Sequence, residues 1–189
     1  MAFKIAVVDL DGCIIDDISR QLDSKLGTRG GPLNGAFREA VFVLMHLVPH
    51  SSEFYASLLR EDALDANVIN AMKSMQEKGT ELHVVTKHKG LDKAWLSRML
   101  ARHGINISTD NIHVVNGDKA YTIDKLRADL VIDDQPDSVL SVGKGPMGER
   151  KILLLKRTYN TVGVTMLKLL RGGGVRITDS QNLAGELEQ

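Results

Sequence analysis

The sequence lacks a second cysteine, a net charge and a long apolar run, and each absence excludes a class of protein. Cys13 is the only cysteine among 189 residues, which rules out a disulfide within the chain and indicates a reducing compartment. The 24 basic residues balance the 24 acidic ones, so nothing indicates a general nucleic-acid-binding or membrane-binding surface. Apart from the first strand, the longest apolar stretch is 41–48, which is interrupted by His46 and is too short to cross a bilayer.

The sequence shows no internal repeat and no low-complexity tract, and we expect no export signal. The apolar run at its N-terminus is short and ends in acidic residues, unlike the apolar segment of a signal peptide. We therefore expect a cytoplasmic protein with no membrane partner and no stable nucleic-acid partner. With 189 residues, 43% of them hydrophobic, the chain can form one domain with a sizeable core and a small appendage.

The N-terminal stretch is the feature around which the rest of the sequence is arranged. Residues 3–8 are apolar except for Lys4, which predicts a strand buried on both faces, as in a parallel sheet covered by helices. Asp9 and Asp11 follow immediately, and Gly12 allows the backbone to turn sharply away from them. Ligands of open α/β sheets bind outside the carboxyl ends of the strands. The two acids are therefore candidates for a functional role.

After the first third of the chain, short apolar strands alternate with amphipathic helices. The strands are predicted at 82–86, 112–115, 130–134, 152–155 and 175–177, and the helices at 65–79, 91–104, 120–127, from Pro136, around 167–170 and from Asp179 or Ser180. This alternation predicts an α/β fold with a doubly wound, Rossmann-like parallel sheet. Residues 16–62 do not share the rhythm and contain an apolar helical pattern over 33–48. We therefore expect an α/β core formed by 1–15 and 63–189, with 16–62 inserted as a small helical cap.

Polar side chains follow several of the predicted strands, and parallel strands would bring them to one edge of the sheet. These residues are Asp9, Asp11, Thr86, Lys119, Asp133 and Asp134. So many carboxylates would repel one another unless a cation lay among them, and oxygen-only ligands select a hard cation such as Mg²⁺. Threonine and lysine are suited to hold phosphate oxygens. The set predicts phosphoryl transfer, which depends mainly on positioning and charge neutralisation.

In their order along the chain, these residues resemble the four motifs of the haloacid dehalogenase superfamily of phosphatases. Further stretches resemble one branch of it, the 5'(3')-deoxyribonucleotidases. They are 117–120, 128–134, the path from Thr86 through Lys93 and Trp95 to Gly104, and Thr158-Tyr159-Asn160. The resemblance covers most of 65–160 and the first strand. The 16–62 insert occupies the position of the family's cap but shows no residue-level match.

The resemblance implies a role for each acidic residue. Asp9 would be the nucleophile that takes the phosphoryl group as an aspartyl-phosphate, and Asp11 would protonate the leaving alcohol and then activate water. Mg²⁺ would be bound by the Asp9 carboxylate, the backbone carbonyl of Asp11 and one acid of the later pair. The same resemblance favours Asp134 over Asp133 as the direct ligand.

The resemblance also implies phosphate ligands. Thr86 and Lys119 would hold the phosphate, and Lys119 would offset the charge around Asp9. Lys87, the neighbour of Thr86, is assigned to the phosphate-binding group as well, because its charge can attract an anionic substrate. His88 either lines the pocket or is a solvated loop histidine, and we favour the second interpretation.

The resemblance makes nucleoside or deoxynucleoside monophosphates the leading substrate class. The alternatives are a phosphatase of polynucleotide 3' ends or of another small phosphomonoester, and a catalytically idle binding module on the same fold. The presence of every expected catalytic residue counts against the idle module. An apolar helix predicted over 37–48 could cover a small phosphorylated substrate or form the contact of a homodimer.

Overall fold

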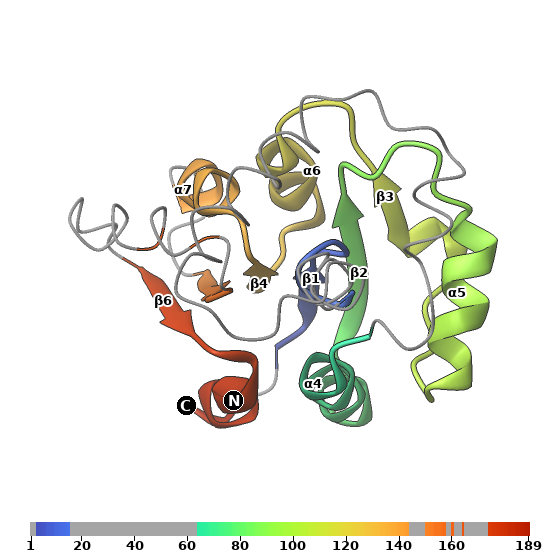
Figure 1. The fold of residues 1–189 in the computed structure, drawn as a ribbon, viewed down its shortest axis with the longest axis horizontal. Helices are drawn as coiled ribbons and strands as arrows, with labels where there is room; N and C mark the ends of the chain where they lie inside the picture. Colours follow the sequence, from blue (N-terminus) through green and yellow to red (C-terminus); the bar gives the residue numbers. More distant parts are fainter. Residues whose placement is uncertain (1–2, 16–63, 144–149, 158–159, 161–163, 165–173) are drawn as a thin grey trace, which may run out of the picture.

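The computed structural model describes residues 3–15, 64–143, 150–157, 160, 164 and 174–189. In this part of the chain, strands form one central sheet and helices lie on both of its faces (Figure 1). The predicted cap at 16–62, with its apolar helix, falls outside the described residues, as does the helix predicted around 167–170.

The central sheet is parallel throughout and has the strand order β3-β2-β1-β4-β5-β6. The strands are β1 (Ile5–Val8), β2 (Glu81–Thr86), β3 (Ile112–Val114), β4 (Leu130–Asp133), β5 (Lys151–Leu155) and β6 (Val175–Thr178). The chain adds β2 and β3 on one side of β1, and β4 to β6 on the other. The order therefore reverses between β1 and β4, which is where ligands of such sheets bind. This topology confirms the predicted doubly wound, Rossmann-like α/β fold.

Helices form a layer on each face of the sheet (Figure 1). They are α4 (Ala66–Glu77), α5 (Lys93–Arg102), α6 (Lys119–Leu126), α7 (Pro136–Gly143) and α9 (Leu183–Glu188), with short 3-10 turns η2 (Thr109–Asn111) and η4 (Ser180–Asn182). The helices α4, α5 and α9 share one apolar cluster, and α6 and α7 share the other. No helix in the described ranges is both long enough and apolar enough to cross a membrane.

The two apolar clusters explain the uninterrupted apolar run of β1. Ala6 and Val8 belong to the cluster beneath α4, α5 and α9, whereas Val7 belongs to the cluster beneath α6 and α7. Side chains alternate between the faces of a strand, so a strand covered on both faces must be apolar at every position. All three residues are at most 1% exposed. This burial fixes β1, and with it the position of the residues that follow.

Two helices begin later than predicted. The helix expected from 91 starts at Lys93, because the side chain of Asp92 caps it by accepting the N–H of Trp95 at 3.0 Å. The helix expected from Asp179 or Ser180 is preceded by the 3-10 turn η4, so that α9 itself begins at Leu183.

Ile15 and Leu64, the described residues on either side of 16–63, form an isolated antiparallel bridge. The N–H of Asp65 donates to the carbonyl of Ile14 at 3.0 Å. The Asp65 side chain then caps α4 by accepting two N–H groups of its first turn. The two ends of the intervening segment therefore lie side by side. The division of the chain into a core and a cap stays a prediction.

Candidate active site

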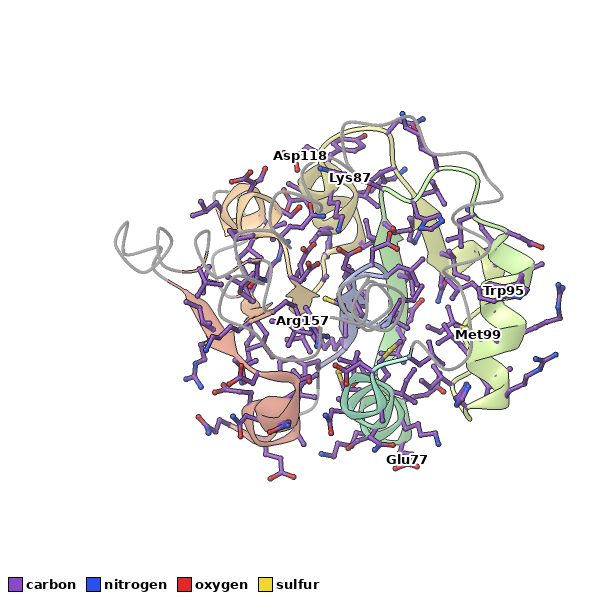
Figure 2. The ribbon with its side chains drawn as sticks, in the orientation of Figure 1. Glu77, Lys87, Trp95, Met99, Asp118 and Arg157 are labelled. Carbon is purple, nitrogen blue, oxygen red and sulfur yellow. The ribbon has the colours of Figure 1, made fainter. Side chains whose placement is uncertain are left out.

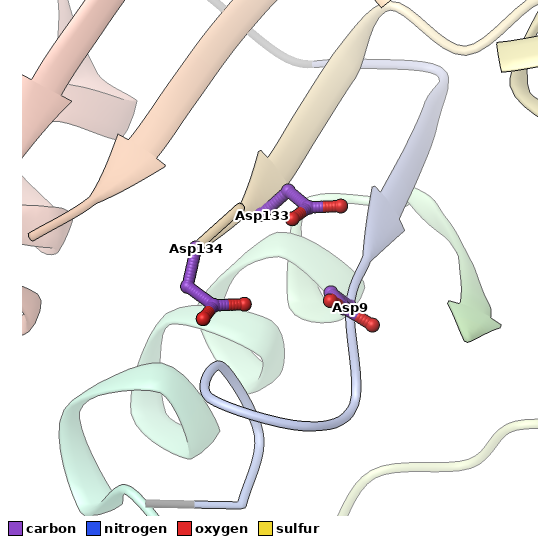
Figure 3. A group of neighbouring side chains, drawn as sticks. All are labelled: Asp9, Asp133 and Asp134. Carbon is purple, nitrogen blue, oxygen red and sulfur yellow. The ribbon is translucent and has the colours of Figure 1, made fainter. Parts of the chain in front are cut away.

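Asp9 lies just beyond the end of β1, among charged side chains (Figure 3). Its backbone N–H donates to the carbonyl of Ile132 at 2.9 Å, which continues the pairing of β1 with β4. Its carboxylate Oδ1 accepts the N–H of Leu10 at 2.7 Å. The backbone then turns at Gly12, where φ is +80°, a conformation that glycine adopts without strain. Asp9 is thereby held in the interior, and the backbone turns directly after Asp11.

Three buried carboxylates meet at this point. Asp9, Asp133 and Asp134 each place a carboxylate oxygen within 4.8 Å of the other two, and each residue is at most 2% exposed. Figure 3 shows Asp9 after β1 and the other two at the end of β4. The Nζ atom of Lys119, the first residue of α6, lies 2.5 Å from Asp9 Oδ2 and 3.0 Å from Asp133 Oδ2. Lys119 therefore balances one of three negative charges in a place where like charges repel strongly.

The pKa values of the cluster follow from this crowding. Burial raises the pKa of Asp9 well above 3.8, against the attraction of Lys119, and the carboxylates of Asp133 and Asp134 raise it further. Burial disfavours the charged form of Lys119, but the adjacent carboxylates of Asp9 and Asp133 outweigh it and raise its pKa above 10.5. Lys119 is therefore an ammonium group. A hard divalent cation would offset the remaining negative charge, and the all-oxygen donor set fits Mg²⁺.

Asp133 and Asp134 differ in what surrounds them. Asp133 uses one carboxylate oxygen for Lys119 and accepts the N–H of Gln135 with the other at 2.8 Å. The backbone carbonyl of Asp134 accepts a hydrogen bond from Asn160 Nδ2 at 2.6 Å. Asp133 can thus orient Lys119, while the choice of Asp134 as the direct metal ligand comes from the family resemblance. The assignment stays a prediction.

Asp11 is the more accessible acid of the site. Its side chain is 35% exposed, compared with 3% for Asp9. The fully buried Thr86, at the end of β2, places Oγ1 at 3.4 Å from Asp11 Oδ2. The ends of β1 and β2 thus bring Thr86 and Asp11 together, as the convergence of parallel strands predicts, and Asp11 can reach a molecule that enters from solvent.

His88 lies inside the site, so the interpretation as a solvated loop histidine is wrong. The residue is only 4% exposed, and its Nδ1 lies 3.1 Å from Asp11 Oδ1 and 3.2 Å from Asp11 Oδ2. Its backbone N–H donates to Thr86 Oγ1 at 3.0 Å, which folds the loop after β2 back onto the strand end. The two-residue spacing from Thr86 was the sequence signal, but spacing alone does not determine which way a loop side chain points.

Lys87 differs from the other predicted phosphate ligands because it is exposed. Figure 2 shows it beside Asp118, the residue that caps α6. A hydrogen bond from Ser141, another from the N–H of Ala120 and the nearby charge of Lys87 lower the pKa of Asp118. The phosphate-binding role of Lys87 stays a prediction.

Arg157 and Asn160 support the site from the segment after β5, where Figure 2 labels Arg157. Arg157 Nε donates to the carbonyl of Gly12 at 2.6 Å and Nη2 to that of Cys13 at 3.3 Å. Asn160 accepts the N–H of Arg157 at 2.8 Å and donates to the carbonyl of Asp134. Asn160 lies in a stretch that resembles the deoxyribonucleotidases, but the resemblance assigns it no role. Nothing singled out Arg157, because its partners are about 145 residues away along the chain.

No family model matches the sequence, and no curated protein matches it either. Solved structures are similar to it in fold. A protein from Burkholderia xenovorans LB400 named as a haloacid dehalogenase-like hydrolase has a TM-score of 0.60 at 12% identity, over 98% of this chain and 96% of that one. D,D-heptose 1.7-bisphosphate phosphatase from B. bronchiseptica, complexed with magnesium and phosphate, has a TM-score of 0.56 at 12% identity over 98% of both chains. A HAD family hydrolase from Deinococcus radiodurans R1, with bound phosphate and sodium, has a TM-score of 0.51 at 13% identity, over 98% and 95%.

At identities of 12–13%, these similarities concern the fold. They extend over nearly the whole length of each protein. The chain therefore has the haloacid dehalogenase-like fold, and the predicted resemblance to that superfamily is confirmed at this level.

Proposed function

We propose that the protein is a Mg²⁺-dependent phosphomonoester hydrolase that works through an aspartyl-phosphate intermediate. One observation carries the proposal. The buried carboxylate of Asp9 contacts an ammonium group and lies beside two further carboxylates, while the more exposed carboxyl of Asp11 is two residues away. A nucleophile, an acid–base group and neutralised charge are the parts that hydrolysis through a phosphoenzyme requires.

In the first step, a carboxylate oxygen of Asp9 attacks phosphorus, and the bond between phosphorus and the ester oxygen breaks. The carboxyl group of Asp11 gives its proton to the departing oxygen, so the leaving group departs as an alcohol. The Thr86 hydroxyl and the Lys119 ammonium group hold the non-bridging oxygens. Because Lys119 Nζ lies 2.5 Å from Asp9 Oδ2, its charge stays next to the negative charge that moves from the nucleophile to the phosphoryl group.

In the second step, Asp11, now a carboxylate, removes a proton from a water molecule. The water oxygen forms a new bond to phosphorus as the bond from phosphorus to the Asp9 oxygen breaks. Inorganic phosphate leaves, Asp9 returns to its carboxylate form, and Asp11 is protonated for the next cycle. One residue thus serves as acid and then as base, which its exposed position permits.

Mg²⁺ fits the carboxylate cluster by the chemistry of its donors. The carboxylates of Asp9 and Asp134 and the backbone carbonyl of Asp11 would hold it, in agreement with the preference of Mg²⁺ for a few carboxylates, waters and a substrate phosphate. When bound, it supplies neutralisation of the charge on the carboxylates and the phosphoryl group. The similarity to a phosphatase solved with magnesium and phosphate supports the same cation.

The substrate class follows from the resemblance to the deoxyribonucleotidases. The residues described above handle the phosphate that all phosphomonoesters share, whereas the resembling stretches 117–120, 128–134 and 158–160 point to nucleoside or deoxynucleoside monophosphates. We therefore place a nucleotide first, ahead of a polynucleotide 3' end or another small phosphomonoester.

The test compares the wild-type protein with Asp9→Asn, with Asp110→Asn as a control in which an exposed acid outside the site is changed in the same way. Hydrolysis of p-nitrophenyl phosphate is measured with Mg²⁺ and after its removal with EDTA. We expect Mg²⁺-dependent turnover in the wild type and in the control. For Asp9→Asn we expect a loss of about a thousandfold or more, as for other nucleophiles.

A substrate panel then separates the classes. It contains nucleoside 5'- and 3'-monophosphates, sugar phosphates and 3'-phosphorylated oligonucleotides. The highest kcat/KM on a nucleoside monophosphate supports the nucleotidase assignment, whereas equal and weak rates on every compound contradict it. Full activity in Asp9→Asn refutes the nucleophile assignment. A wild-type protein that is inactive with every divalent metal favours the idle binding module.

A further inference from the structure

We propose that His88 is a positioning residue that holds the carboxyl group of Asp11 in the orientation required for proton transfer. The inference rests on the proposed function, because it assigns a partner to the acid–base group of that reaction. Its basis is the pair of contacts from His88 Nδ1 to the two oxygens of Asp11, at 3.1 and 3.2 Å.

Asp11 needs such a partner because its side chain is partly exposed to solvent. Its side chain is 35% exposed, and it precedes the turn at Gly12. An exposed carboxyl group samples several rotamers, whereas proton transfer requires a hydrogen-bond distance to the leaving oxygen. A misplacement of about 1 Å lowers the rate of a positioned reaction about a hundredfold. A rigid contact to the carboxyl group therefore has a direct effect on catalysis.

His88 can provide a rigid contact because it is itself fixed at two points. Its side chain is 2% exposed, so the ring is enclosed, and its backbone N–H is bound to Thr86 Oγ1 at 3.0 Å. With the proton on Nδ1, the tautomer that suits a carboxylate acceptor, the ring donates to one oxygen of Asp11. The second oxygen is then left to carry the proton that Asp11 transfers.

Within the described residues, Asp11 also contacts Thr86, and the proposed function would change this contact when substrate binds. Thr86 Oγ1 lies 3.4 Å from Asp11 Oδ2, and its hydroxyl has a single hydrogen to donate. Once this hydrogen is directed to a phosphate oxygen, as the proposed function requires, it no longer serves Asp11. The contact from His88 does not compete with phosphate in this way. His88 thus keeps Asp11 in place during the steps in which Asp11 acts.

The experiment uses His88→Phe, which keeps a ring of similar volume without a polar atom, and His88→Asn, whose amide replaces Nδ1. The matched control is His103→Phe at the half-buried C-terminal end of α5. The kcat/KM of each protein is measured with saturating Mg²⁺ on an aryl ester, p-nitrophenyl phosphate, and on an alkyl ester, glycerol phosphate. Aryl oxide leaves without a proton far more readily than alkoxide, so only the alkyl ester depends strongly on the acid.

We expect His88→Phe to lower kcat/KM about tenfold to a hundredfold on the alkyl ester, part of the contribution that general acid catalysis makes, and much less on the aryl ester. His88→Asn should restore most of the loss, and His103→Phe should leave the ratio of the two substrates unchanged. In the Asp11→Asn background, His88→Phe should have no further effect, because both changes act through one carboxyl group.

Equal losses on both esters, or additive losses in the Asp11→Asn background, would show that His88 has a packing role and would overturn the inference. If circular dichroism shows that His88→Phe is unfolded, His88→Gln takes its place, since its amide lies one methylene farther along and should reproduce the selective loss. Different results refute the proposed function, namely an inactive wild type or an active Asp9→Asn variant. If hydrolysis depends on Asp9 but the ratio of kcat/KM on the two esters is the same in the His88 variants as in the wild type, only the inference about His88 is refuted.

Discussion

Arg157 Nη1 lies 2.8 Å from Asp65 Oδ2, and this ion pair joins the segment after β5 to the start of α4. Both side chains are buried, at 8% and 4% exposed. The same guanidinium group donates to the carbonyls of Gly12 and Cys13, which follow Asp11. One side chain therefore fixes both the turn after Asp11 and the start of α4.

We predict that Arg157→Met lowers the free energy of unfolding by about 3 kcal/mol or more, because it leaves the buried carboxylate of Asp65 without its ion pair. Urea denaturation at neutral pH measures the loss. Arg176→Met is the control, since Arg176 is 53% exposed in its ion pair with Glu186, and exposed pairs contribute about 1 kcal/mol or less. Equal losses in the two variants would refute a structural role for the buried pair.

The same pair predicts a pH dependence. Burial alone would raise the pKa of Asp65, but the hydrogen bond and charge of Arg157 outweigh it and lower the pKa below 3.8. A carboxyl group with a lowered pKa in the folded state stabilises the protein above the pKa of the unfolded chain, and this contribution is lost as pH falls through the folded value. The difference in unfolding free energy between wild type and Arg157→Met should therefore shrink below about pH 4. A constant difference down to the acid unfolding transition would argue against it.

The fold was predictable because the strands and the helices each have a local sequence pattern. The buried strands β1, β4 and β5 are continuous apolar runs, and the helices between them begin at capping acids such as Asp65 and Asp118. Because these strands are joined through helices, which are the usual crossover between parallel strands, parallel pairing was expected. The first residue of a helix was harder to predict than the helix itself, because a single side-chain cap or a 3-10 turn decides where the helix begins.

The site was predictable where its residues lie at a strand end or in the turn that follows one. Asp9 and Thr86 follow this rule, since Asp9 comes directly after β1 and Thr86 ends β2 at the same edge of the parallel sheet. Arg157 and His88 could not be assigned in this way, since their contacts depend on how a loop folds across residues distant in the sequence. An arginine after a strand is usually solvated, and a loop histidine usually is as well. Their burial follows from tertiary packing, which no local pattern encodes.

Asn160 offers a second test of the support around the site. Its Nδ2 donates to the carbonyls of Asp134 and Leu155, at 2.6 and 2.8 Å, and so fixes the backbone that carries a predicted metal ligand. We expect Asn160→Leu to raise the Mg²⁺ concentration at half-maximal activity about tenfold to a hundredfold, as when other supports of metal ligands are removed. The control is Asn111→Leu, an amide in η2 directly before the start of β3. An unchanged Mg²⁺ dependence would show that Asp134 does not rely on Asn160.

His83 and His113 form a pair on neighbouring strands. Their rings stack with centroids 5.3 Å apart, and His83 Nδ1 lies 3.1 Å from His113 Nε2. Glu81 Oε1 lies 3.1 Å from the other nitrogen of His83. Burial and then the charges of His83, Lys93 and Lys125 lower the pKa of His113 below 6.5. The folded protein therefore takes up a proton at His113 less readily than the unfolded chain does.

This difference sets the sign of a further pH effect. As pH falls below about 6.5, the unfolded chain binds the proton first, so the free energy of unfolding decreases. We predict that His113→Asn loses less stability than the wild type between about pH 7.5 and about pH 5.5 in urea denaturation. His103→Asn is the control for a histidine outside the pair. Identical pH profiles for the wild type and His113→Asn would show that the pair does not govern this range.

The contrast between Asp133 and Asp134 allows their roles to be separated by metal binding rather than by activity. Asp133 already serves Lys119 and the N–H of Gln135, so Asp133→Asn should lower activity but keep most of the Mg²⁺ affinity. Asp134→Asn should weaken Mg²⁺ binding in calorimetry by more than about a hundredfold, beyond the loss on removing an outer support of a ligand, and abolish the rise in melting temperature that a ligand of the folded state produces. Asp137→Asn, an exposed acid in the first turn of α7, should behave as the wild type. Weaker Mg²⁺ binding in Asp133→Asn than in Asp134→Asn would reverse the two assignments.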